Sequence, residues 1–342
     1  ESVKFLAGHK IFNWTALEAF HPADIVNARN YDSNLENLEK KGELTVELQS
    51  VIGEGTLSFY YFPRFERPEF PETSSRYSGG VNLDRPYVVE DGEPSRDYWV
   101  PQYGVRLSQY LFDTDFSLHY LNRIDRYFPV VGYADYQDVL SPPSPTEYVP
   151  NDTSAISPYY FRSQQVGGTV QKPFGATLFK LEWAYRDFNP ETEILDVASF
   201  TAQDSQLLQP QDHTDVALGL EHQFHLSGGG DLTLFFEARS LFGPSKKERL
   251  RMALFQRDVL GGLRYAFNDI MGKEIYFISI WDIEKSREFL LNANYQQRLS
   301  DYWKIKTGVK WFDSKRDDHY RSTGLESFNG DEHVFMNLSR YF

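Results

Sequence analysis

The chain has 342 residues, a formal net charge of −14 and no cysteine. The absence of cysteine excludes disulfides, thiolate metal sites and cysteine nucleophiles, and the acidic balance argues against nucleic acid as a partner. Mean hydropathy is −0.52, and no segment approaches the run of about 18 apolar residues that a membrane-spanning helix requires.

Alternation of apolar and polar residues, with turn signals between the alternating runs, predicts about fourteen strands. The expected strands are 2–10, 42–51, 55–63, 98–111, 115–126, 160–172, 175–188, 213–226, 231–243, 255–267, 273–285, 287–299, 302–313 and 332–342. Soluble β-propellers also consist of repeated hairpins, but no period of about 40–50 residues is present here.

The connections between these strands alternate in length. The short connections are 51–55, 112–115, 173–174, 227–230, 268–272 and 300–301. The long connections are 11–41, 64–97, 127–159, 189–212, 244–254 and 314–331. Only the link at 284–287 is short where the alternation calls for a long one.

The first long connection, 11–41, is too apolar for a solvated loop, because Trp14, Leu17 and Phe20 favour burial. We expect it to fold into the interior of the sheet, with Trp14, Phe20, Asp24 and Arg29 as its constricting residues; the alternative is an ordered cap on the rim. A capping box of Thr15 and Glu18 predicts a short helix in this loop. Pro22 is placed to open a second helical turn.

The strand at 175–188 separates its two faces clearly. Thr177, Phe179, Leu181, Trp183 and Tyr185 fall on one face, and Lys180, Glu182, Ala184 and Arg186 fall on the other. The strands at 231–243 and 302–313 follow the same pattern. The strand at 273–285 is bulky on both faces, so its register stays open, and one interpretation is that a loop covers it from inside.

The charged face is predominantly basic, in contrast to the acidic chain as a whole. Eight of its residues are predicted to line a path for solute: Lys180, Arg186, Arg239, Arg264, Arg298, Lys304, Lys306 and Lys310. The remaining charged residues expected on this face are Lys4, Arg106, Arg123, Glu47, Asp125, Glu182, Glu221, Glu237 and Asp258. Two interpretations remain open: charges of both signs paired into ladders, or a basic wall that attracts anions.

Catalytic and metal sites have little support. The best acid–base candidates are His213, between Asp212 and Asp215, and His319, beside Asp317 and Asp318, but no serine motif accompanies either. We therefore expect no catalytic residues, no cofactor and no dedicated metal site. The segment 329–332, Asn-Gly-Asp-Glu, is only a weak candidate for binding Ca²⁺.

The last strand ends on an aromatic residue and places Val334, Met336, Leu338 and Phe342 on one face. It resembles the final strand of bacterial outer-membrane β-barrels, whose terminal aromatic residue is read by the assembly machinery. An aromatic content of 16%, an even strand count and alternating short and long connections fit such barrels. The resemblance implies an all-β fold: a transmembrane, antiparallel, up-and-down barrel of about 14 strands, one domain over residues 1–342.

A second resemblance lies near the N-terminus. Gly8-His9-Lys10, then Trp14, then the run from His21-Pro22 through Asp24 to Asn27 is similar to a motif in a poorly characterised family of Gram-negative outer-membrane barrels. Members of that family are often encoded near RND-type exporters. The family has no assigned catalytic residues. The resemblance implies a role in envelope transport of hydrophobic or lipid-like cargo.

These observations predict an outer-membrane channel or transporter for a small or amphipathic, anionic solute, partly occluded by loop 11–41. The alternatives are a non-conducting structural or partner-binding barrel within an export system, or an enzyme at the barrel rim. The expected partners are outer-membrane lipids, lipopolysaccharide, the solute and periplasmic export components. A chain that starts at Glu1 without a signal peptide fits a mature, processed protein.

Overall fold

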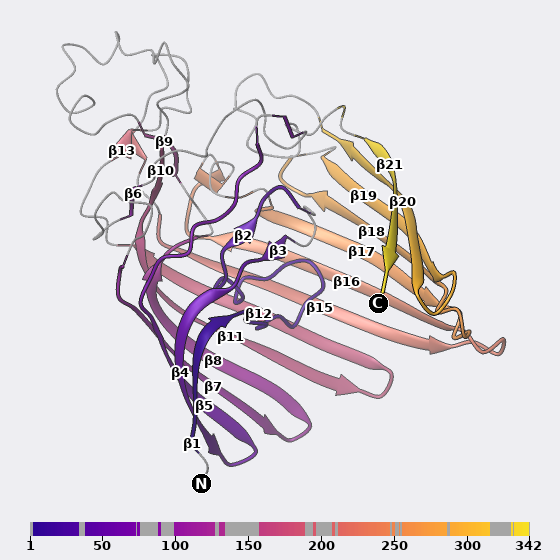
Figure 1. Ribbon diagram of the computed structural model, residues 1–342, viewed down its shortest axis with the longest axis horizontal. Coiled ribbons are helices and arrows are strands. Elements are labelled where there is room, and N and C mark those ends of the chain that lie inside the picture. The colour runs from indigo at the N-terminus through magenta and orange to yellow at the C-terminus, as the bar shows by residue number, and fades with distance from the viewer. Residues whose placement is uncertain are drawn as a thin grey trace.

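The protein is built around one large antiparallel β-sheet (Figure 1). The computed structural model describes residues 3–33, 38–72, 74–75, 88–89, 99–126, 130–133, 157–188, 194–195, 207–208, 211–246, 248–249, 253, 255–285, 288–314, 330 and 332–341. Fourteen strands pair with their neighbours in chain order, which makes the sheet an up-and-down meander. Among the described residues no helix is long and apolar enough to cross a membrane.

The strands of this sheet are, in spatial order, β1 (Val3–Lys10), β4 (Glu43–Ile52), β5 (Gly55–Phe62), β7 (Gln102–Leu111), β8 (Thr114–Ile124), β11 (Arg162–Phe174), β12 (Thr177–Phe188), β15 (His213–His225), β16 (Asp231–Phe242), β17 (Arg257–Ala266), β18 (Glu274–Asp282), β19 (Phe289–Arg298), β20 (Trp303–Asp313) and β21 (His333–Arg340). All fourteen predicted strands are confirmed. The largest difference in a bound is four residues, at the start of β7, predicted at 98 and observed at 102.

The alternation of connection lengths is also confirmed, since the six predicted short connections fall at one end of the sheet, and the link between β18 and β19 is the expected exception at the other end. The turn between β7 and β8 is Phe112-Asp113, with φ angles of 53° and 55°. Two such left-handed residues are typical of the tight hairpin turn that matches strand twist. The long connections carry short extra strands: β2 (Arg29–Asn30), β3 (Glu39–Lys40), β6 (Val88–Val89), β9 (Val130–Tyr133), β10 (Ser157–Tyr160), β13 (Ile194–Leu195) and β14 (Leu207–Leu208).

The two faces of the sheet differ as the alternation predicts. On β12 the side chains of Lys180, Glu182 and Arg186 are buried, on what we call the inner face. The opposite, outer face leaves large apolar side chains uncovered: Phe5, Leu48, Phe59, Leu220, Phe236, Trp311 and Met336 are each between 47% and 70% exposed. An apolar surface of this extent, spread over most strands, is rare on a soluble monomer.

The described residues of the connection between β1 and β4, 11–33 and 38–42, lie within the curve of the sheet (Figure 1). We call this connection the inner loop. Its Trp14 packs with Tyr60, Phe62 and Leu121 of β5 and β8, whereas its Phe20 joins an apolar cluster from β15 to β20. The predicted inward fold is therefore confirmed, and the rim cap is not observed. The cluster also explains β18, whose Ile278 and Ile280 are buried beneath the inner loop.

The predicted helix at Thr15–Glu18 is wrong, and so is the helical turn at Pro22. The described backbone from residue 11 to 28 forms bends and turns only. The capping hydroxyl of Thr15 donates to Asn13 instead, at 2.9 Å. The backbone N–H groups that a helix would use internally are bonded to the sheet wall, so the loop satisfies its donors without helical structure.

The sheet has two free edges in this structure. Strands β1 and β21 are its first and last members, and no pairing joins them among the described residues. Their residues are mostly exposed. The fold shown is therefore a strongly curved fourteen-stranded sheet wrapped around the inner loop, and the closed barrel stays a prediction.

Close packing of the inner loop predicts that Gly219 is intolerant of a side chain. A Cβ at this inner-face position of β15 would lie 2.3 Å from Leu17 Cδ2 of the loop. We expect Gly219→Ala to destabilise the protein by roughly 1–3 kcal/mol, the usual cost of overpacking, measured by urea unfolding of the refolded protein. Gly261→Ala is the control, because a Cβ there meets Trp281 at an ordinary 3.6 Å. Equal stability of the two variants would contradict the packing described.

Candidate functional site: the inner face and its loop

Two buried glutamates of the inner face hold the inner loop by its backbone. Glu182 on β12 accepts hydrogen bonds from the N–H groups of Ala16 at 2.5 Å, Leu17 at 2.9 Å and Ala23 at 3.4 Å. Glu237 on β16 accepts from the next three N–H groups, of residues 18, 19 and 20, at 2.5, 3.1 and 3.3 Å. Hydrogen bonds from N–H to a carboxylate are stronger than neutral ones. The backbone donors of the loop and the buried carboxylates of the sheet therefore satisfy each other's hydrogen-bonding capacity.

Two predicted path residues belong to this anchoring region. Arg186 donates from Nη2 to the carbonyl of Pro22 at 2.9 Å and from Nε to Gln165 at 2.9 Å. Lys180 pairs with Glu221 at 2.8 Å and contacts Glu18 of the loop at 3.5 Å. Neither cation is free to meet solute, because both hold the loop against the wall.

The other end of the loop is fixed near β4. Asn27 accepts a hydrogen bond from the N–H of Phe12 at 2.7 Å and donates to the carbonyls of Lys10 and Lys41 at 3.0 and 2.7 Å. Ala28 donates to Glu43 at 2.8 Å. The other oxygen of Glu43 pairs with buried arginines 123 and 126 at 3.2 and 3.0 Å. These bonds close the loop into a compact unit.

The four predicted constriction residues have distinct roles. Trp14 and Phe20 are apolar anchors, at 3% and 1% exposure, on opposite sides of the curved sheet. Asp24 is buried and pairs with Lys40 and, at 3.6 Å, with Arg29. Arg29 also donates to the carbonyls of Asp24 and Leu38. The ion pairs and hydrogen bonds of Asp24, Arg29 and Lys40 therefore connect parts of the loop to each other.

The eight predicted path residues divide into two groups. Lys180, Arg186, Arg239 and Lys310 are buried, and Arg239 forms a two-pronged pair with Asp215 at 3.0 and 2.6 Å. Toward the short turns, the inner face carries Arg264, Arg298, Lys304 and Lys306, which are partly or fully exposed and form no ion pair with any described residue.

We call the second group the basic column; its residues lie on β17, β19 and β20. Arg298 on β19 is directly opposite Lys304 on β20, and Lys306 follows on the same face opposite Gln296. Arg264 lies on β17 opposite Tyr276. Lys180 and Arg239 therefore form ion pairs, as the first interpretation expects, whereas the basic column forms none with a described residue. That the basic column attracts anions stays a prediction.

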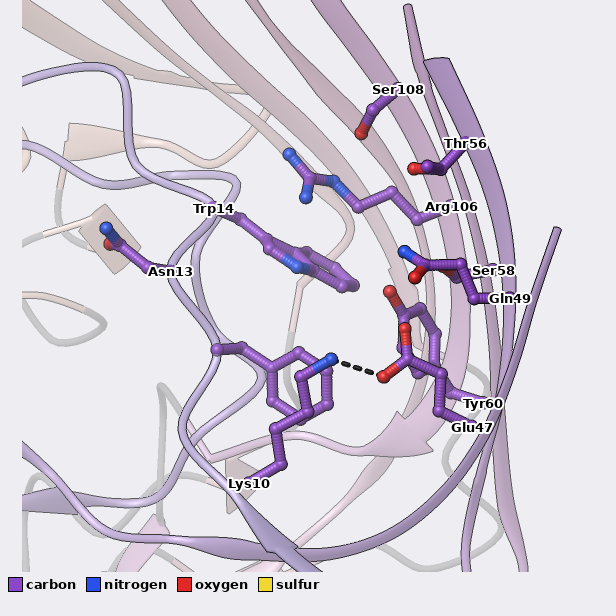
Figure 2. Close-up of a pocket in the computed structure, with 11 residues that line it drawn as sticks. Lys10, Asn13, Trp14, Glu47, Gln49, Thr56, Ser58, Tyr60, Arg106 and Ser108 are labelled. Atoms are coloured by element: carbon purple, nitrogen blue, oxygen red, sulfur yellow. Dashed lines mark hydrogen bonds and ion pairs between the residues drawn. The ribbon is translucent and has the colours of Figure 1, made fainter. Parts of the chain in front are cut away.

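A cavity of about 180 Å³ lies between the inner loop and strands β1, β4, β5 and β7 (Figure 2). Lys10 enters it from β1 and forms an ion pair with Glu47. The guanidinium of Arg106 lies over the ring of Trp14, at 4.9 Å from its centroid. The cavity thus combines cations, aromatic rings and polar side chains in a half-enclosed space.

Of the two histidine candidates, the structure describes His213 alone. His213 is buried rather than exposed at a rim, with Nε2 at 3.0 Å from Arg186 and Nδ1 at 2.8 Å from the carbonyl of Gln211. Both ring nitrogens are therefore engaged. His319 lies outside the described residues, as do residues 329 and 331 of the segment 329–332. Among the described residues, no three acidic or histidine side chains are grouped to hold a metal ion.

Several residues of this region were absent from the predicted inner set. Glu43 and Asp215 are buried ion-pair partners, and Lys10 lines the cavity. Alternation did contain the signal, since Glu43 is in phase with Glu47, and Asp215 with Glu221. The pairings themselves require the register between strands, which the sequence does not specify.

Comparisons with known proteins add no relative: no protein-family model matches the chain, and a search of curated proteins finds no match. The family resemblance of the N-terminal segment therefore stays a prediction.

The hydrogen bonds from the loop to Glu182 and Glu237, which we call the carboxylate clamp, predict a local effect of removing either glutamate. Glu182→Ala and Glu237→Ala each leave three loop N–H groups without acceptors, and an unmet buried donor costs about 1–3 kcal/mol. We expect amide hydrogen exchange over residues 16–23 to accelerate by about tenfold or more, with the strands keeping their protection. The control is Glu54→Ala, in the exposed turn between β4 and β5. Unchanged exchange in both variants would rule out the clamp.

Proposed function

We propose that the protein is an outer-membrane channel for small anionic solutes, with the inner loop as its constriction. The observation that carries the proposal is the reversed polarity of the sheet. Its outer face presents large apolar side chains, while its inner face buries ionised groups. A soluble β-protein places its apolar face inward, whereas a barrel in lipid places it outward. A Lys or Arg at mid-membrane on the lipid side costs about 2–4 kcal/mol.

Barrel closure is part of this proposal. The free edges have matching patterns: β1 places Val3, Phe5 and Ala7 outward, and β21 places Val334, Met336 and Leu338 outward, as their pairings with β4 and β20 indicate. An antiparallel pairing with Val3 near Arg340 and His9 near Val334 aligns these faces. It would also satisfy the backbone groups of both edges, which lipid does not hydrate.

Orientation follows from the connections. In outer-membrane barrels the short turns face the periplasm and the long loops face outward. The basic column, near the short turns, would then line the periplasmic entrance, and lipids and lipopolysaccharide would surround the outer face. A low-dielectric wall strengthens the field of unpaired cations, so anions are concentrated at such an entrance.

One observation favours a second candidate, a non-conducting barrel that serves as a partner-binding component of an export system. The inner loop is held at two places, by Glu182 and Glu237 at residues 16–23 and by Glu43 at residue 28. A loop anchored so extensively would block a static pore. Channel and structural barrel are distinguished by whether current flows.

Planar-bilayer recording of the purified protein tests the channel. We expect a stable conductance with anion preference, read as the reversal potential under a salt gradient. The double variant Lys304→Glu, Lys306→Glu should shift that potential toward cation preference, because it inverts the charge of two unpaired wall residues. Lys273→Glu is the control, since Lys273 lies in a turn and is paired with Asp269 at 2.9 Å.

Two outcomes are decisive against the channel. Absence of current at every voltage, in the wild type and in the double variant Glu182→Ala, Glu237→Ala, would favour the structural barrel. Current without anion preference, unaffected by charge reversal in the basic column, would remove the column from the solute path.

A further inference from the structure

The cavity between the inner loop and β1, β4, β5 and β7 is lined by one cation, Arg106, that has no ion-pair partner among the described residues. Lys10 and Glu47 neutralise each other as an ion pair (Figure 2). Arg106 of β7 forms no ion pair with a described residue, and its Nε is buried without a hydrogen-bond partner. A guanidinium in this state has unused donors that suit a planar, anionic acceptor.

The position of this guanidinium is fixed. It lies 4.9 Å from the centroid of the Trp14 ring, a cation–π distance. Trp14 itself is buried against the loop and β5. In Figure 2 Arg106 and Trp14 reach toward each other across the cavity from the sheet and the loop. A cation that is already ordered loses little entropy when it binds an anion.

Hydroxyl groups surround the rest of the cavity. Thr56 and Ser108 are opposite each other on β5 and β7, and Ser58 is opposite Arg106 itself. Each hydroxyl both donates and accepts, so the row suits the hydroxyl groups of a ligand. The rings of Trp14 and Tyr60 supply an apolar surface beside it. The lining is mainly polar, with these two rings as its apolar part, and this suits a hydroxylated ligand better than an apolar one.

We propose that this cavity binds a small hydroxylated carboxylate, such as a sugar acid, with the carboxylate on Arg106 and the hydroxyl groups on Thr56, Ser58 and Ser108. The cavity volume of about 180 Å³ limits the ligand to a small molecule. As a statement about the transported solute, the inference rests on the proposed function. Binding itself can be measured without transport.

Isothermal titration calorimetry of the refolded protein in detergent micelles tests the site, with galacturonate as the probe. Galactose is the matched neutral control, since it differs by the carboxylate alone, and glucosamine is the cationic control. We expect one galacturonate per chain and no measurable heat from either control at the same concentrations. Arg106→Gln should weaken binding about tenfold or more, as expected for a lost charge-assisted hydrogen bond.

Three further variants make the result specific. Arg106→Lys keeps the positive charge but lacks the paired N–H donors of the guanidinium. It should bind galacturonate more weakly than the wild type and more tightly than Arg106→Gln. Ser108→Ala should weaken galacturonate binding a few-fold, and it leaves the cation in place. Lys273→Gln removes one exposed positive charge in a turn and should bind like the wild type.

The site is overturned if galactose binds as tightly as galacturonate, if Arg106→Gln binds unchanged, or if galacturonate does not bind at millimolar concentration. These results are separable from those of bilayer recording. If the protein binds galacturonate but carries no current, the binding site is supported and the channel is contradicted. If it carries current but does not bind galacturonate, the channel is supported and the binding site is contradicted.

Discussion

The structure depends on the hydrogen bonds by which the inner face and the inner loop satisfy each other's buried polar groups. Ionised side chains within a curved sheet need partners, because a buried charge without one is costly. A loop whose backbone forms no helix needs acceptors for its N–H groups. Glu182 and Glu237 meet both needs at once, accepting from six loop N–H groups. Removing the loop would leave these carboxylates without donors, and removing the carboxylates would leave the loop unanchored.

This arrangement divides the inner face into two regions with different chemistry. Beneath the loop buried charges form ion pairs, as Arg239 does with Asp215, although both carboxylate oxygens of Asp258 have no hydrogen-bond partner in the described part of the chain. Nearer the short turns, Lys304 and Lys306 have no ion-pair partner among the described residues. In the proposed channel the first region would hold the constriction in place, and the second would attract solute. The cavity at Arg106 lies at the margin of the loop, where Trp14 meets the wall.

Much of the fold could be predicted from the sequence, because the strand period of two is directly visible in it. The strands, the short turns and the face carrying Lys180 and Arg186 all follow from that period. The burial of Trp14 and Phe20 follows from their size and apolarity. The backbone conformation of the loop did not follow, since Thr15 and Glu18 fit a helical cap locally, and the competing acceptors Glu182 and Glu237 are more than 160 residues away.

The candidate site was less predictable for a related reason. Alternation assigns a charge to a face, but only the register between strands shows whether that charge has a partner. Lys180 and Lys304 therefore look equivalent in the sequence, although the first is paired with Glu221 and the second faces Arg298. The cavity at Arg106 depends on a contact between β7 and a loop about 90 residues earlier, which no local pattern encodes.

The central claim is that the apolar face of the sheet meets lipid and the charged face meets water. Spin labels on single cysteines along β20, in protein reconstituted into lipid vesicles, test it directly, because the chain has no cysteine of its own. We expect labels at Ile305, Val309 and Trp311 to be accessible to oxygen dissolved in the bilayer, and labels at Lys304 and Lys306 to be accessible to a water-soluble nickel chelate. Equal access of the nickel chelate to both sets would contradict the claim, because it would place both faces of the sheet in water.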